Sequence, residues 1–284
     1  MKHNGTLLRF PKGLVKAVTL SYDDGVLEDV RLIDIMRRNR LKGTFNVNTA
    51  YYPSPDFVYP PEVQWGRRLT EECATSLYSQ DGIEPAIHGH THPVFSSMPP
   101  AQVTYDVIRD RERLEAQFGH IVRGMAYPFG DYNDNVLHCL RSCGIAYCRT
   151  TKSTHRFDIP ADWLCWHPTC HHGDPKLFEL TKKFLDEVRP NWLSVRVFYL
   201  WGHAYEFEQN GNWDIIERFA AEMGNRDDIW YATNIEIFEY VEAFRQLVFS
   251  LDETIVTNPT SKKLWFCLRE KLYAVNPGET MRLD

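Results

Sequence analysis

Short apolar segments rich in β-branched residues alternate with amphipathic segments along most of the chain. Residues 15–21 are the first apolar segment, and Val26, Val30 and Ile33 then recur at the spacing of one helix face. Further strands are expected at 43–48, 83–87, 122–127, 145–149, 193–201 and 229–231. Further helices are expected at 69–79, 103–118, 176–188, 213–223 and 235–247, with another that ends near 143. The pattern therefore indicates repeated strand–helix units.

Repeated strand–helix units with short links predict a parallel sheet covered by helices. About seven such units, without a glycine-rich phosphate fingerprint, favour a closed barrel over a dinucleotide-binding sheet. The expected fold class is α/β, a distorted (β/α)7-type barrel over residues 1–249. Residues 250–284 alternate like strands, so we expect a small β-rich C-terminal extension that packs on the barrel.

Composition excludes several classes of function. The 284 residues are 43% hydrophobic and 25% charged, as is ordinary for a globular protein. No apolar run reaches the ~18 residues of a membrane-spanning helix. A net charge of −6 without a basic run argues against nucleic acid or an anionic membrane as the partner. The seven cysteines form no C-x-x-C pair and no signal-peptide-like stretch is present, so we expect a cytoplasmic protein with reduced thiols.

Polar residues gather where four of the predicted strands end. The four positions are Asp23-Asp24, 88–92, 128–130 and Gly202-His203. The carboxyl ends of all strands in an α/β barrel open onto one face, where active sites lie. We therefore expect these four groups to meet in one site.

Residues 88–92, H-G-H-T-H, carry the most specific signal, because three imidazoles within five residues are typical of metal sites. Two imidazoles and one carboxylate leave coordination positions open for water and substrate, which is the catalytic arrangement. Of two adjacent aspartates, one can bind the ion while the other acts as general base on the metal-bound water. Cys165 and Cys170, with their neighbouring histidines, match no structural zinc spacing.

Four motifs together resemble those of the polysaccharide deacetylase family, also called NodB-homology or carbohydrate esterase family 4. Residues 19–25 read T-L-S-Y-D-D-G, close to that family's T-F-D-D-G, and residues 84–93 resemble its H-[S/T]-x-x-H-P motif. Residues 126–130, A-Y-P-F-G, resemble its R-x-P-[Y/F]-G motif, and residues 200–203 a variant of its L-x-H motif. The resemblance covers residues 13–245 and implies a distorted barrel and a metal-dependent hydrolase of C–N amide bonds.

The resemblance also implies a role for each matching residue. One divalent ion, with zinc expected, would be held by Asp24, His88 and His92. Asp23 would be the general base, and the backbone N–H of Phe129 would stabilise the oxyanion. His203 would protonate the departing amine, which is a poor leaving group as an anion.

Three departures from the family pattern bear on the substrate. Gly89 stands where the family has Ser or Thr, so one hydrogen bond near the metal is missing. Ala126 replaces the arginine that orients the base, and Asp162-Trp163 lies too far past its strand to match the later D-W motif. With the expected cytoplasmic location, these departures argue against cell-wall polysaccharide. They favour an oligosaccharide or small molecule: an N-acyl sugar, a formyl amine or a cyclic imide.

Arg149 is a candidate for the function of the missing arginine. It ends the predicted strand 145–149, which is next to the strand that ends at Ala126, and so faces the same barrel mouth. A guanidinium within about 4–6 Å of Asp23 would orient that carboxylate and keep its pKa low. The alternative is a solvated charge at a strand end.

Two other readings remain open from the sequence. An amidohydrolase-type barrel would also bind metal through an H-x-H pair, but would carry that pair on its first strand, where this chain has aspartates. A non-catalytic relative that binds sugar would have lost the base or a ligand, and both are present here. His171 and His172 are candidates for the rim of the pocket, and Glu206 either orients His203, binds substrate hydroxyls or lies in a surface loop; the sequence does not choose between these roles.

Overall fold

The computed structural model describes residues 6–188, 190 and 193–283. Its centre is a curled sheet of eight described strands in which every neighbouring pair runs parallel. Across the sheet the strands are β6 (Tyr147–Arg149), β5 (Gly124–Ala126), β4 (Ile83–Ile87), β3 (Gly43–Val47), β2 (Lys16–Asp23), β8 (Arg196–Gly202) and β7 (Cys170–His171). β9 (Ile229–Tyr231) pairs with the first half of β2. The expected distorted (β/α)7-type barrel is confirmed.

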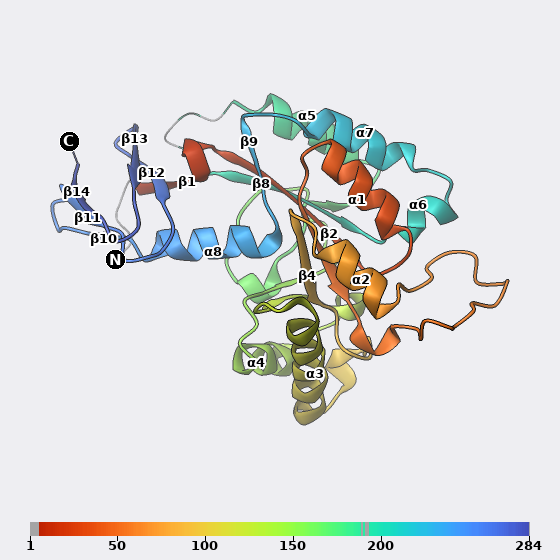
Figure 1. The fold of residues 1–284 in the computed structure, drawn as a ribbon. Coiled ribbons are helices and arrows are strands. Elements are labelled where there is room, and N and C mark those ends of the chain that lie inside the picture. The colour runs from red at the N-terminus through yellow and green to blue at the C-terminus, as the bar shows by residue number, and fades with distance from the viewer. Residues whose placement is uncertain (1–5, 189, 191–192, 284) are drawn as a thin grey trace.

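Helices pack around the sheet, with α1, α5 and α7 on one side and α2, α3 and α4 on another (Figure 1). The described helices are α1 (Asp29–Arg38), α2 (Glu71–Tyr78), α3 (Pro100–Phe118), α4 (Asp134–Ser142), α5 (Leu177–Asp186), α6 (Tyr205–Gln209), α7 (Asp214–Met223) and α8 (Asn234–Arg245). All but the short α6 follow the periodicity of apolar residues. Local signals mark their ends, because Gly119 stops α3 at φ 70° and Thr233 begins α8 with a capping box to Glu236.

The β-rich extension is present as two small antiparallel sheets. One contains β1 (Thr6–Arg9), β12 (Leu264–Leu268) and β13 (Lys271–Val275), and the other β10 (Val248–Phe249), β11 (Ile255–Thr257) and β14 (Thr280–Arg282). β1 comes from the N-terminal end of the chain, so residues 6–9 share a sheet with β12 and β13 of the C-terminal extension (Figure 1). Periodicity did not predict β1, since a four-residue strand is defined only by its distant partner.

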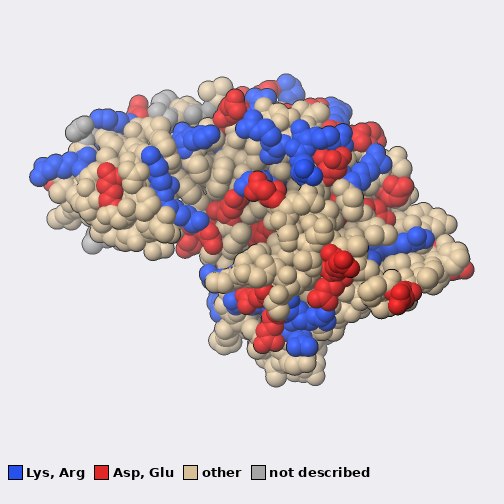
Figure 2. All heavy atoms as spheres, viewed as in Figure 1, with Lys and Arg blue, Asp and Glu red and all other residues tan. Residues whose placement is uncertain are grey.

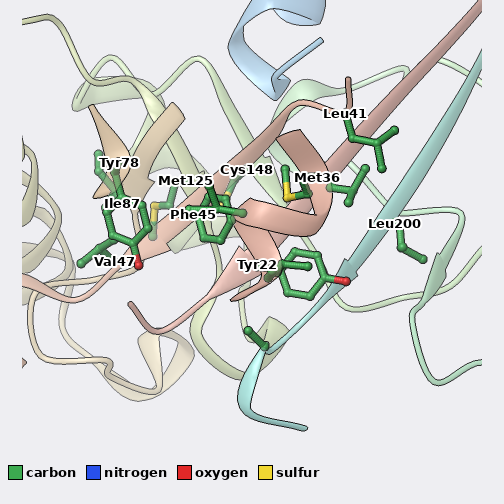
Figure 3. Packing of buried hydrophobic residues seen from close by; sticks show 14 of the residues in the cluster. Tyr22, Met36, Leu41, Phe45, Val47, Tyr78, Ile87, Met125, Cys148 and Leu200 are labelled. Carbon is green, nitrogen blue, oxygen red and sulfur yellow. The ribbon is translucent and has the colours of Figure 1, made fainter. Parts of the chain in front are cut away.

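Aromatic and aliphatic side chains of β2 and β3 form the main core with α1 and α2. Tyr22 stacks on Phe45 with ring centroids 6.3 Å apart, and Phe45 stacks on Tyr78 at 5.2 Å (Figure 3). Met36 of α1 is also fully buried against them. Burial of each such side chain is worth about 1.5–3 kcal/mol. This packing holds the carboxyl end of β2 in place, and the polar residues follow directly after it.

None of the helices among the described residues is long and apolar enough to cross a membrane. Acidic and basic side chains are interspersed over the face seen in Figure 2, so that face presents no extended basic surface.

Candidate active site

The two aspartates lie at the point where β2 ends. Asp23 is the last residue of the strand and is 2% exposed, and its Oδ1 accepts a hydrogen bond of 2.9 Å from Asn46 Nδ2. Asp24 has a left-handed backbone at φ 88°, and Gly25 follows at φ 68°. A non-glycine residue in this region is held against its preference, as is common at functional sites. This turn directs the two neighbouring carboxylates to different partners.

Two histidines of the segment after β4 face Asp24. His88 Nδ1 lies 2.9 Å from the carbonyl oxygen of Ala126, so Nδ1 carries the proton and Nε2 is available as a ligand. His88 Nε2 lies 4.0 Å from Asp24 Oδ1, and His92 Nε2 lies 3.8 Å from the same oxygen. Burial lowers the pKa of His88 to about 4, despite the neighbouring aspartates, so the imidazole is neutral.

Asp24, His88 and His92 fit a divalent ion. One ligand atom from each lies within 4.8 Å of the other two. The buried Oδ1 of Asp24 accepts no hydrogen bond from a described residue, although it lies 2.9 Å from Arg68 Nη2 in an ion pair. Neutral imidazoles with one carboxylate are the donor set that zinc and similar ions take in catalytic sites.

Helix α3 holds the histidine segment through two buried carboxylates. Asp110 accepts hydrogen bonds from the backbone N–H of His88, at 3.1 Å, and from Thr49. Asp106 accepts one from the hydroxyl of Thr91 at 2.6 Å and one from its N–H at 3.1 Å. Gly89 itself has φ 72°, a conformation that favours glycine. The Thr91 hydroxyl therefore lies close to the histidine segment, two positions after Gly89, where the family pattern has Ser or Thr.

Arg149 is fully buried and pairs through Nη2 with Asp23 Oδ2. Its guanidinium also lies over the ring of Trp201, 4.4 Å from the centroid. Burial alone would raise the pKa of Asp23, but the charge of Arg149, with His88 and His203, lowers it to about 2. The expected contact between Arg149 and Asp23 is present, and its contribution to catalysis stays a prediction.

The remaining candidates lie around the aspartates. His203, which follows β8, has Nε2 at 3.8 Å from Asp23 Oδ2 and 4.0 Å from Asp24 Oδ2. Phe129, after β5, has a left-handed backbone at φ 58° and a ring 65% exposed. That ring packs against His92 with centroids 4.5 Å apart. The structure thus brings all seven candidates to the carboxyl ends of β2, β4, β5, β6 and β8.

Sequence reasoning missed Arg68, which ends the long loop after β3. Besides the ion pair with Asp24 Oδ1, its Nη1 donates to the carbonyl oxygen of Asp24 and, at 3.1 Å, to Asn48 Oδ1. Nothing in the local sequence marks this arginine, because only the path of the loop brings it to the site.

Two weaker candidates lie elsewhere. His90 Nδ1 is 2.8 Å from the Thr49 hydroxyl, outside the group of ligand atoms around Asp24. Asp162 pairs with Arg141 at 2.8 Å and accepts a hydrogen bond from the N–H of Leu164, as an N-cap does. Neither is part of the site.

The chain is similar to known proteins at the level of family and fold. Residues 10–148 match the family model of polysaccharide deacetylases. No curated protein matches the chain. A candidate polysaccharide deacetylase from Mycobacterium smegmatis is 18% identical, with a TM-score of 0.57 over 84% of this chain and 94% of that one. This likeness supports the fold alone.

Two further solved structures match less closely. The Streptococcus pyogenes deacetylase PplD, in complex with acetate, is 22% identical, with a TM-score of 0.40 over 47% of this chain. This chain spans 55% of its length. A carbohydrate esterase family 4 pseudoenzyme from Bacillus anthracis, BA3943, is 14% identical, with a TM-score of 0.48 over 82% of this chain and 68% of that one.

Proposed function

We propose that this chain, a divergent member of the polysaccharide deacetylase family, hydrolyses the C–N amide bond of an N-acyl sugar or a related small amide with the help of a divalent ion. One observation carries the proposal: ligand atoms of Asp24, His88 and His92 gather within 4.8 Å of one another, beside a second, buried carboxylate and an imidazole. This is the set of groups that a metal-assisted amide hydrolase needs.

The ion would be held by Asp24, His88 and His92, and zinc is the ion that we expect. When bound, such an ion supplies a Lewis acid that polarises the substrate carbonyl and acidifies the attacking water. The protein contributes the neutral state and orientation of His88, since its Nδ1–H donates to Ala126 and Nε2 stays free.

Asp23 is the candidate general base. Its carboxylate is ionised well below neutral pH because Arg149 offsets the cost of burial. Asn46 holds Oδ1 and Arg149 holds Oδ2, so both oxygens have defined orientations. A buried, fixed carboxylate of this kind can accept a proton from the attacking water without first reorganising.

His203 is the candidate general acid. Burial lowers its pKa, but the hydrogen bond to Glu206 and the charges of Asp23 and Asp24 outweigh burial and raise the pKa overall. The surrounding carboxylates therefore stabilise the protonated form of His203, and its Nε2 faces the two aspartates from across the site. Proton donation from Nε2 would let the amine leave as a neutral molecule. The N–H of Phe129 would stabilise the oxyanion.

A hydrolysis screen tests the proposal. The purified protein is loaded with zinc and offered N-acetyl sugars, chito-oligosaccharides, formyl amines and cyclic imides, and released acid and amine are measured. We expect turnover of an N-acyl sugar, lost with a chelator and in Asp24→Ala. If acid and amine are released from cyclic imides alone, the substrate is a cyclic imide and not an N-acyl sugar. Binding of sugars without any hydrolysis would favour a non-catalytic relative.

A further inference from the structure

Three imidazoles converge on the carboxylate of Glu206, next to the candidate acid. His171 Nε2 and His172 Nε2 each lie 3.0 Å from Oε2 of Glu206. His203 Nδ1 lies 3.2 Å from the other oxygen, Oε1. His171 ends β7 and His172 follows it, whereas His203 and Glu206 follow β8. Two neighbouring strands thus bring three imidazoles to one carboxylate.

The protons of this cluster can be assigned from its contacts. The backbone N–H of Gly173 donates to His171 Nδ1 at 3.1 Å, so Nδ1 has a free lone pair and Nε2 carries the proton. A carboxylate only accepts hydrogen bonds, so His172 Nε2 and His203 Nδ1 also face Glu206 as donors. His203 Nδ1 therefore donates to Oε1 of Glu206, while Nε2 of His171 and Nε2 of His172 face Oε2 at 3.0 Å; together these contacts lower the pKa of Glu206 far below its usual range.

The same assignment argues against a second metal ion here, although His171, His203 and Glu206 offer ligand atoms within 4.8 Å of one another. A neutral imidazole that binds metal through Nε2 has its proton on Nδ1. In His171 that proton would point at the N–H of Gly173, which already donates to Nδ1. The hydrogen bond from Gly173 therefore argues against His171 as a metal ligand.

Packing holds the histidine pair at this distance. The N–H of His172 donates to the carbonyl oxygen of Trp201 at 2.8 Å, which sets the register of the pair against β8. The His172 ring stacks on Phe207 with centroids 4.0 Å apart. A Cβ at Gly202 would lie 2.0 Å from His172 Nδ1, so the close approach requires glycine at that position.

We propose that Glu206, held by His171 and His172, is the positioning residue that fixes the tautomer and the orientation of His203. With Nδ1–H donated to Glu206, His203 presents Nε2 to the two aspartates. Nε2 is then the nitrogen that gains and loses the transferred proton. The proposal rests on the role of His203 as acid, and it gives His171 and His172 a function through Glu206 rather than through substrate.

The other carboxylate on the helix of Glu206 is engaged elsewhere. Glu208 accepts a hydrogen bond of 2.6 Å from Trp213 Nε1. Asp23 and Asp24 face Nε2 and not Nδ1. Among the described residues, Glu206 is the carboxylate hydrogen-bonded to Nδ1.

The test compares Glu206→Gln with the matched control Glu208→Gln in the zinc-loaded protein. The imidazole nitrogen chemical shifts of His203 report its tautomer directly. We expect Nδ1–H in the wild type and the control, and a mixture of tautomers in Glu206→Gln, since an amide can present either its oxygen or its NH2 group to His203 Nδ1. With the substrate from the screen, Glu206→Gln should lower kcat by about 10²–10³ and leave KM within about twofold.

A second variant separates positioning from folding. His172→Phe keeps the ring stacked on Phe207 and removes one donor to Glu206, so we expect a smaller loss of kcat, about tenfold. Unchanged His203 shifts in Glu206→Gln would overturn the proposal, as would a second bound zinc that is lost in His171→Ala. If the screen finds no substrate, the nitrogen shifts still decide it, so its failure is distinct from failure of the proposed function.

Discussion

Removal of the Arg149 guanidinium should destabilise the folded protein in a pH-dependent way. Arg149→Met keeps an apolar chain of similar length against Trp201 and leaves Asp23 buried without its counter-charge. In the wild type, the pKa of Asp23 falls from 3.8 to about 2 even though burial raises it. At about 1.4 kcal/mol per pKa unit, this shift corresponds to about 2.5 kcal/mol in favour of the folded state.

The variant loses more than this amount, because the largest interaction that opposes the burial of Asp23 is then missing. Breaking a buried ion pair on one side costs about 3–5 kcal/mol. In the wild type the stabilisation is complete above the unfolded pKa of 3.8 and is lost as the pH falls towards about 2. In Arg149→Met we expect the folded pKa of Asp23 to lie above the unfolded value of 3.8, so the sign reverses and stability falls as the pH rises from 3.8 towards the raised folded pKa.

Urea unfolding of chelator-treated protein between pH 5 and pH 8 measures the effect without a bound ion. We expect the deficit of Arg149→Met to grow with pH and the double variant Asp23→Asn, Arg149→Met to recover part of it. The coupling free energy between the two positions is the difference between the stability change of the double variant and the sum of the changes of the two single variants. A deficit that is the same at every pH, or a double variant no more stable than the single one, would refute this account of the pair.

Three further predictions concern the ion, the base and a buried acid. His88→Ala and His92→Ala should each lose the bound ion by elemental analysis, and full occupancy in either would remove that residue from the ligand set. Asp23→Asn should keep the ion and lose about 10²–10⁴ in activity, whereas Asp24→Asn should lose the ion as well; equal metal loss in both would contradict these roles. Burial raises the pKa of Glu84 to about 7, so its ionisation lowers stability as the pH rises from 4.5 towards 7. Glu84→Gln should remove about 3 kcal/mol of this dependence in urea unfolding, and an unchanged pH profile would disprove it.

The strand–helix alternation was readable from the sequence because it depends on local periodicity. The helices bury one face, so their apolar residues repeat at helical spacing, and β2 and β3 are short runs buried on both faces. Placement of Asp23, His88 and His203 near one another also followed, since the carboxyl ends of parallel strands meet on one face. Predicting the contact between Arg149 and Asp23 required one further assumption, namely that β6 lies beside β5 in the sheet.

Other features depend on segments that only the tertiary structure brings together. β1 pairs with β12 from the opposite end of the chain, and a four-residue strand has no periodicity that identifies its partner. Arg68 reaches Asp24 because a long loop folds back, and a loop path is set by packing and not by a local repeat.

The histidine cluster also combines residues that the sequence shows with contacts that only the tertiary structure sets. The sequence shows His171, His172 and Glu206 as polar residues near strand ends, without partners. Their convergence needs the register of β7 on β8, set by hydrogen bonds between strands, and the missing side chain of Gly202. Sequence by itself thus determined which residue types stand at the ends of the strands, because periodicity and motif spacing are local. The tertiary structure alone decided which nitrogen faces which oxygen, because hydrogen-bond geometry depends on distances of a few tenths of an ångström between separate elements.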